Sequence, residues 1–160
     1  MDEVEIRHFK AADRDWLVAA HGTHYAREEG FDASFERLVA EIIDGFIADH
    51  DPARERGWVA WQGGRRLGCI FCVALDETTA KLRLFLLMPE ARGKGLGRRL
   101  LETCMGFARE KGYAGMQLWT HESHAAAVAL YRRAGWEMTG AHPVVSFGKP
   151  NVEQTWIFRF

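Results

Sequence analysis

The chain has 160 residues, of which 48% are hydrophobic and 27% charged, and its net charge at pH 7 is -1. This composition suits one globular domain, and the lack of a basic surplus argues against nucleic acid as a partner. The odd set of three cysteines has no framework spacing, which favours a reducing compartment. Neither a signal-peptide pattern nor a long apolar run is present. We therefore expect one cytoplasmic domain over residues 1–160, with no nucleic-acid or membrane partner.

The first third of the chain predicts a strand followed by two helices. Residues 4–9 alternate between apolar and polar side chains, as a half-buried strand does. Asp13 can cap a helix that runs toward Gly30. Apolar side chains then recur every three or four positions from Phe35 to Ile47, which predicts an amphipathic helix that ends before Pro52.

The middle of the chain predicts three strands. Residues 58–61 and 67–75 flank a Gly-Gly pair, a pattern typical of a β-hairpin. Residues 81–88 form the third strand, which Pro89 ends. Its last five residues are all apolar, so both faces of this strand should be covered, as at the centre of a sheet.

The last third predicts alternating helices and strands. An amphipathic helix begins at Leu96 and stops at Gly112, and a strand over residues 116–120 follows. Ser123 can cap the next helix. Residues 136–142 and 152–160 close the chain as two strands. The order β-α-α-β-β-β-α-β-α-β-β predicts a mixed α/β fold.

A glycine-rich loop over residues 92–97 lies between the central strand and an amphipathic helix. Free N–H groups at a helix start attract anions, and glycines let a phosphate approach the backbone. The same turn carries four cations, which are Arg92, Lys94, Arg98 and Arg99. The Gly-x-Gly-x-Gly spacing matches neither a Walker A loop nor a dinucleotide fingerprint. The pattern favours an anion-binding loop over the alternative, a turn beside a solvated basic face.

Two motifs resemble those of the GNAT acetyltransferases. The first is Arg92-x-x-Gly95-x-Gly97 after the strand, and the second is the run Ala-Leu-Tyr-Arg-Arg-Ala-Gly-Trp over residues 129–136. The element order fits the GNAT fold along essentially the whole chain. A narrower likeness, carried by residues 21–28, 82–83, 147–148 and 153–156, is to the GNAT domains of bacterial MarR–GNAT fusion proteins, although no winged-helix segment is present.

The resemblance implies an N-acetyltransferase that uses acetyl-CoA, no metal, and a small-molecule amine that attacks the thioester directly. Tyr131 would protonate the departing thiolate. The pyrophosphate would bind the loop backbone and the pantetheine would lie along the central strand. The implied cofactor-binding residues are Leu86, Leu87, Met88, Arg92, Gly93, Lys94, Gly95, Leu96, Gly97, Arg98, His124 and Ala127.

This chain departs from the family pattern at two places. His124 stands where many members carry asparagine, and the central strand lacks the glutamate that often acts as base. A water chain, His24, Glu28 or Glu122 could take that role. Tyr131 could also be an ordinary core residue. A non-catalytic acyl-CoA sensor is therefore the alternative function, and either a monomer or a homodimer is compatible with the sequence.

The acceptor pocket is predicted from spacing. Strict alternation along residues 82–88 places Arg83 with Phe85 and Leu87 on one face, toward the pocket. Arg83 would bind a carboxylate of the acceptor, unless Glu153 pairs with it permanently. The helix that carries His24, Tyr25 and Glu28 would close this pocket.

Overall fold

The computed structural model describes residues 3–160, so the acidic start at Met1 and Asp2 lies outside the described residues. The expected element order is confirmed. The strands are β1 (Val4–His8), β2 (Arg56–Gln62), β3 (Arg65–Ala74), β4 (Thr79–Leu87), β5 (Gly115–His121), β6 (Glu137–Ser146) and β7 (Lys149–Arg159). The helices are α1 (Arg14–Glu29), α2 (Ala33–Asp49), α3 (Leu96–Glu110) and α4 (Ala125–Arg133), with short 3₁₀ turns η1 (Ala11–Asp13) and η2 (Pro89–Ala91).

The strands form one mixed sheet in the order β1-β2-β3-β4-β5-β7-β6. Neighbouring strands are antiparallel except β4 and β5, which run parallel. The predicted central strand, β4, is the fourth of the seven, as its apolar faces indicated. No helix within residues 3–160 combines the length and apolarity that a membrane span requires.

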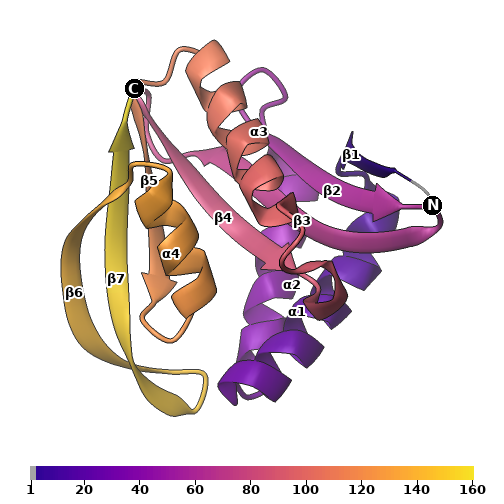
Figure 1. Ribbon diagram of the computed structural model, residues 1–160, viewed down its shortest axis with the longest axis vertical. Helices are drawn as coiled ribbons and strands as arrows, with labels where there is room; N and C mark the ends of the chain where they lie inside the picture. Colours follow the sequence, from indigo (N-terminus) through magenta and orange to yellow (C-terminus); the bar gives the residue numbers. More distant parts are fainter. Residues whose placement is uncertain (1–2) are drawn as a thin grey trace.

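Helices cover both faces of the sheet (Figure 1). On one face α3 and α4 bury residues such as Leu100, Leu101 and Tyr131 against the sheet. On the other, α1 and α2 bury Leu17 and Ile43. The two cores lie on opposite faces of the sheet, so a residue's face on a strand decides which helix pair it contacts.

Two predicted helix caps differ from the structure. Asp13 occupies the position before α1, but its carboxylate accepts hydrogen bonds from the Lys10 N–H and the Arg66 Nε, both at 2.9 Å, instead of capping the helix. The residue before α4 is His124, not Ser123. Propensity favours Asp and Ser as caps. Here the Asp13 carboxylate instead bonds to Lys10 and Arg66, and the Ser123 hydroxyl accepts from Asn151 Nδ2 at 2.9 Å.

Strands β4 and β5 separate after a short paired stretch. They pair only from Thr79 with Gly115 to Lys81 with Gln117, and beyond this point they diverge (Figure 1). Because the strands are parallel, both carboxyl ends lie on the same side of the gap. The glycine loop follows β4 and the start of α4 follows β5, so two helix starts face the gap.

A β-bulge in β4 breaks the predicted alternation. Cys69 pairs with Leu86 and Phe71 with Arg83, so two β4 residues stand opposite the single residue Ile70. Leu84 has a positive φ of 52° at this point. As a result Arg83 and Leu84 both face the α1–α2 side. The predicted grouping of Arg83 with Phe85 and Leu87 is therefore wrong.

Candidate active site

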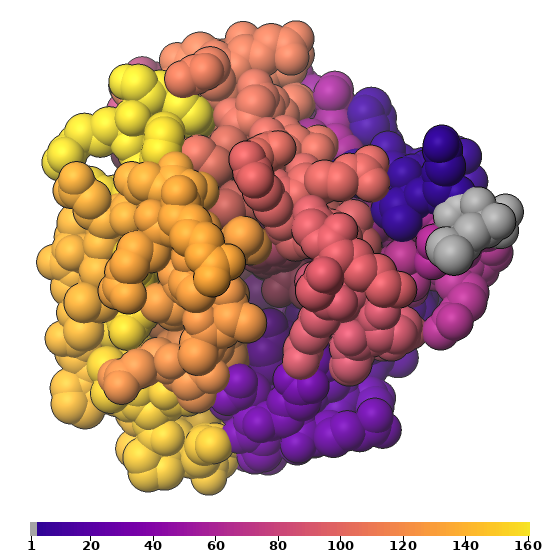
Figure 2. Space-filling view, in the orientation of Figure 1, coloured from indigo at the N-terminus to yellow at the C-terminus, as the bar shows by residue number. Residues whose placement is uncertain are grey.

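A cleft of about 1000 Å³ opens between α3, α4 and the carboxyl end of α1. Figure 2 shows this hollow between the segments of α3 and α4, with the α1 segment below it. The glycine loop and the first turn of α4 line it, together with the divergent end of β4. The gap in the sheet thus becomes the wall of one continuous cavity.

The glycine loop has the geometry of an anion cradle. Gly93 and Gly95 have φ values of 75° and 76°, and a Cβ built on either would meet no atom within 4 Å. Among the described residues, no acceptor is bonded to the N–H groups of Gly93, Lys94 and Gly95. Gly97 differs, since its Cβ would lie 3.4 Å from Leu130. The first two glycines therefore leave space for a ligand, while the third lets α3 pack closely.

The four cations of this turn are mostly bound to protein groups. Arg98 Nε donates to Glu102 at 2.8 Å, and Arg99 donates to the Val4 carbonyl at 3.4 Å. Arg92 contacts α1, and Lys94 has no partner among the residues described. Arg92, Arg98 and Arg99 thus already contact protein groups, because acceptors lie within reach of their long side chains, and their contact with an anion stays a prediction.

The end of β4 forms the floor of the cleft. Phe85, Leu86 and Leu87 line it, although the sequence analysis did not place Phe85 among the site residues. The Tyr25 hydroxyl donates to the Phe85 carbonyl at 3.5 Å. Met88 packs on the α1–α2 side and its N–H donates to the Leu67 carbonyl at 2.8 Å, so it does not line the cleft, and its predicted contact with the cofactor has no support from this geometry.

The start of α4 carries two predicted site residues into the cleft. His124 and Ala127 both line it, whereas Leu96 of the glycine loop is buried in the core at 3% exposure. Lys94 is not part of the lining. The predicted cofactor set therefore includes both cleft-lining groups and residues that only support them.

Tyr131 lies one turn after Ala127, directly behind the cleft wall. Its side chain is 3% exposed, and its ring centroid is 6.3 Å from that of Phe85. Its hydroxyl makes no hydrogen bond to any residue in the described part of the chain. Burial raises the pKa of Tyr131, so the hydroxyl holds its proton at neutral pH.

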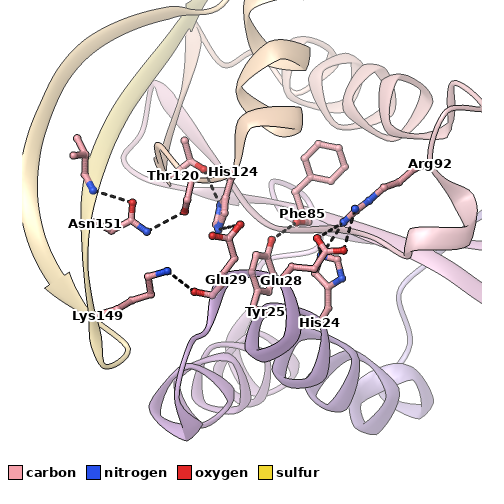
Figure 3. A network of polar contacts seen from close by, with 12 residues as sticks. His24, Tyr25, Glu28, Glu29, Phe85, Arg92, Thr120, His124, Lys149 and Asn151 are labelled. Carbon is pink, nitrogen blue, oxygen red and sulfur yellow. Dashed lines mark hydrogen bonds and ion pairs between the residues drawn. The ribbon is translucent and has the colours of Figure 1, made fainter.

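An ion-pair network joins α1 to the glycine loop (Figure 3). Arg92 donates to both Glu28 oxygens, at 3.1 and 2.9 Å, and its other contact is His24 Nε2 at 3.0 Å. The hydrogen bonds from Arg92 lower the pKa of Glu28, while burial lowers that of His24. His24, Tyr25 and Glu28 therefore do lie together at the cleft, as their spacing predicted.

A second polar group at the cleft was missed by the sequence analysis. Glu29 Oε1 lies 3.7 Å from His124 Nε2, and the Thr120 hydroxyl lies 3.2 Å from His124 Nδ1 (Figure 3). Glu29 follows Tyr25 by four residues and so shares its helical face, a signal that was available in the sequence. Of the bases considered, His24 and Glu28 line the cleft and Glu122 does not.

Arg83 is not at this site. It lines a separate cavity of about 400 Å³ on the α2 side, with Asp49, His50 and Glu55. Glu153 lies on β7 opposite His121, and its carboxylate is 3.6 Å from His142 Nε2. The predicted Arg83–Glu153 pair and the carboxylate pocket on Arg83 are both wrong, because the bulge turns Arg83 to the other face.

No group of three or more His, Cys, Asp or Glu side chains within residues 3–160 could hold a metal ion. The groups at the cleft are instead backbone donors, carboxylates, imidazoles and the half-buried phenol of Tyr25, with the buried phenol of Tyr131 behind the wall. This set is suited to anion binding and proton transfer.

Comparison with known proteins places the chain among acetyltransferases. The profile of the acetyltransferase (GNAT) family matches residues 14–136. N-acetyltransferase family 8 member 2 of Rattus norvegicus is 30% identical over 128 residues, which cover 74% of this chain and 56% of that protein. Mycothiol acetyltransferase of Salinispora arenicola is 30% identical over 105 residues, or 61% of this chain and 30% of that protein. The chain spans about half the length, or less, of these curated relatives.

Solved structures share the fold over nearly the full chain. Ribosomal-protein-alanine N-acetyltransferase from Brucella melitensis aligns with 98% of this chain and 99% of its own, with a TM-score of 0.79 and 21% identity. The structure of yncA from Salmonella typhimurium, which contains its cofactor acetyl-CoA, aligns with 98% of this chain and 93% of its own, with a TM-score of 0.75 and 19% identity. At these identities the likeness is one of fold.

Proposed function

The chain belongs to the GNAT acetyltransferase family, and from this premise we propose that it is an active N-acetyltransferase that transfers the acetyl group of acetyl-CoA directly to a small amine. One observation carries the proposal. The open glycine loop, Phe85 and the carboxylates of α1 line one cleft, and the buried Tyr131 lies behind its wall with its ring 6.3 Å from that of Phe85.

The cleft fits acetyl-CoA by its chemistry. The free N–H groups of Gly93 to Gly95 and the α3 dipole can hold a pyrophosphate, and no side chain blocks the approach. Beyond its last pair with β5, β4 offers backbone groups to an extended pantetheine arm. The fold shared with yncA, whose structure contains acetyl-CoA, supports this placement.

The residues of this chain divide the chemistry between them. A β4 backbone N–H at the gap polarises the thioester carbonyl, as donors aimed at developing negative charge do. Tyr131, which stays protonated, gives its proton to the departing thiolate. Direct attack requires only that the acceptor nitrogen reach the carbonyl from the α1 side of the cleft.

The narrower likeness to the GNAT domains of MarR fusion proteins stays a prediction. The same holds for a bacterial source, for a cytoplasmic location and for the choice between monomer and homodimer. An acceptor that carries a carboxylate, in contrast, has lost its support, because Arg83 faces another cavity.

The test is thiol release from acetyl-CoA in the presence of amino acids, polyamines and aminoglycosides. We expect at least one amine to release CoA well above the rate without acceptor, and mass spectrometry to show the acetylated amine. Calorimetric binding of acetyl-CoA with no thiol release for any amine would identify the chain as an acyl-CoA sensor instead.

A further inference from the structure

Glu29 places a carboxylate in the cleft without a permanent counter-charge. Its side chain is 13% exposed and lines the cavity from the last turn of α1. Among residues 3–160, no lysine or arginine nitrogen lies within 4.0 Å of this carboxylate, and its only ion-pair neighbour is His124. The adjacent Glu28 differs, since Arg92 donates to both of its oxygens.

The imidazoles around Glu29 do not supply the missing charge at neutral pH. Burial lowers the pKa of His24 and His121, and it lowers that of His124 to about 4, although Glu29 opposes the shift. Lys149 is also close, but its Nζ donates at 2.7 Å to the backbone carbonyl of Glu29. The positive charge that pairs with the Glu29 carboxylate must therefore belong to a bound ligand.

A largely buried, unpaired carboxylate is costly, so this arrangement needs a compensating role. The Thr120 hydroxyl can donate to His124 Nδ1, which leaves the proton of the neutral ring on Nε2, facing Glu29 at 3.7 Å. That distance is too long for a hydrogen bond, and His124 Nε2 has no hydrogen-bond partner among the described residues. The lone pairs of Glu29 therefore stay available to a ligand in the cleft.

The walls near Glu29 suit an alkylammonium ion. The Tyr25 ring lies 5.0 Å from that of His124, and its hydroxyl reaches the floor of the cleft at the Phe85 carbonyl. A tyrosine face attracts a cation, and an apolar floor accepts methylene groups. The one arginine of this end, Arg92, is held by Glu28, so nothing comparable is free to bind an acceptor carboxylate.

We propose that Glu29 binds the acceptor as an alkylammonium ion with no carboxylate next to the amine, and that it then takes one proton from that nitrogen. The inference rests on the proposed function and names its substrate class and its base. The freed nitrogen lone pair bonds to the thioester carbon and the carbon–sulfur bond breaks. A second nitrogen proton replaces the one that Tyr131 gives to sulfur. The products are the amide, CoA thiol and one proton, which leaves Glu29 for solvent.

The binding test uses butylamine, butanol and butyrate, which share a chain and differ in charge. Each is titrated calorimetrically into the protein saturated with CoA, at neutral pH. The unaltered chain should bind butylamine at least about tenfold more tightly than butanol or butyrate, and Glu29→Gln should abolish this preference. Glu110→Gln, which removes an exposed carboxylate outside the cleft, is the matched control and should change nothing. Absent binding of butylamine, or a preference unchanged by Glu29→Gln, overturns the proposal.

The turnover test separates a base from a structural residue. Ethylamine is protonated at neutral pH, whereas trifluoroethylamine is mostly neutral and needs no base. Glu29→Gln should slow acetylation of ethylamine by about 10²-fold or more and that of trifluoroethylamine far less, with an unchanged Tm and acetyl-CoA affinity. An equal decrease in the acetylation rates of both amines would show that Glu29 does not take part in proton transfer. Ammonium binding at Glu29 without thiol release from any amine would instead refute the proposed function and leave the ammonium site in place.

Discussion

The two ends of the cleft are built in opposite ways. The cofactor end is a continuous segment, residues 92–98, that presents backbone N–H groups. The acceptor end is assembled from side chains of α1, β5 and the start of α4, which lie far apart in the sequence and meet where β4 and β5 diverge. Figure 3 shows the second arrangement, with Glu29, His124 and Thr120 in one row.

The difference predicts opposite sensitivities. A backbone site tolerates most side-chain changes but not the loss of a glycine that keeps space open. A side-chain site depends on each functional group and on its protonation state. Substitutions and pH should therefore affect the two ends differently, and the following predictions run from the largest effect to the smallest.

The largest effect is expected at Tyr131, whose ring lies behind the cleft wall, 6.3 Å from that of Phe85. Tyr131→Phe should lower kcat by about 10²–10⁴-fold, as the loss of a general acid does, while acetyl-CoA affinity stays the same. Steady-state kinetics and calorimetry measure the two. Tyr113→Phe is the control, because Tyr113 is equally buried but donates its hydroxyl to the Arg54 carbonyl at 2.8 Å, outside the cleft. An unchanged kcat of Tyr131→Phe, in an assay in which the chemical step limits the rate, would show that Tyr131 is a core residue with no role in the reaction.

The second largest effect is expected at acidic pH, which should lower the stability of the fold through His21, beside Tyr25 of the acceptor end. His21 is 2% exposed beneath Tyr25, and burial lowers its pKa from 6.5 to about 4. As the pH falls, the unfolded chain therefore binds this proton at a higher pH than the folded chain does. The part of the free energy of unfolding that is present above pH 6.5 is lost as the pH falls toward the pKa of the folded state. The loss from this residue should be about 2 kcal/mol between pH 6.5 and 4.5.

Chemical denaturation at several pH values measures this loss. His21→Gln, which keeps a donor for the Leu17 carbonyl but does not titrate, should flatten the pH dependence by that amount. His8→Gln, at an exposed position, should leave it unchanged. An identical slope in all three proteins would show that His21 does not govern acid sensitivity.

A third prediction isolates the backbone end. Gly95→Ala and Gly112→Ala both place a Cβ at a positive φ, 76° and 85°, with no atom within 4 Å. Each should lose about 1–2 kcal/mol of stability from backbone strain. Only Gly95 lines the cleft, so only Gly95→Ala should weaken acetyl-CoA binding, by about tenfold or more in calorimetry. Equal affinities for the two variants would mean that the pyrophosphate binds elsewhere.

The smallest effect is expected outside both ends. Arg83→Met should leave kcat/KM for any acceptor within about twofold, because Arg83 faces the cavity beside α2. Kinetics with acceptors that do and do not carry a carboxylate measure this. A selective rise in KM for the carboxylate-bearing acceptors would show that Arg83 reaches the cleft after all.

Much of the fold and of the cofactor end could be predicted because their signals are local. Periodicity identified the helices and strands, and the glycine spacing after Arg92 indicated a loop that a phosphate can approach at a helix start. The same reasoning overlooked the partners of the cations. Arg98 and Glu102 stand four residues apart on α3, a spacing that the sequence displays, whereas the contact of Arg92 with Glu28 joins two distant segments. Partners of long side chains are decided by what lies within reach in space.

The sequence by itself determined the element order, the central strand and the open glycine loop at a helix start, because φ preferences and hydrophobic periods belong to consecutive residues. The tertiary structure decided the acceptor end. A single extra residue in β4 reversed the face of Arg83, since strand alternation has a period of two and one insertion inverts it. The divergence of β4 from β5 let the end of α1 bring Glu29 beside His124, a meeting that depends on how distant segments pack.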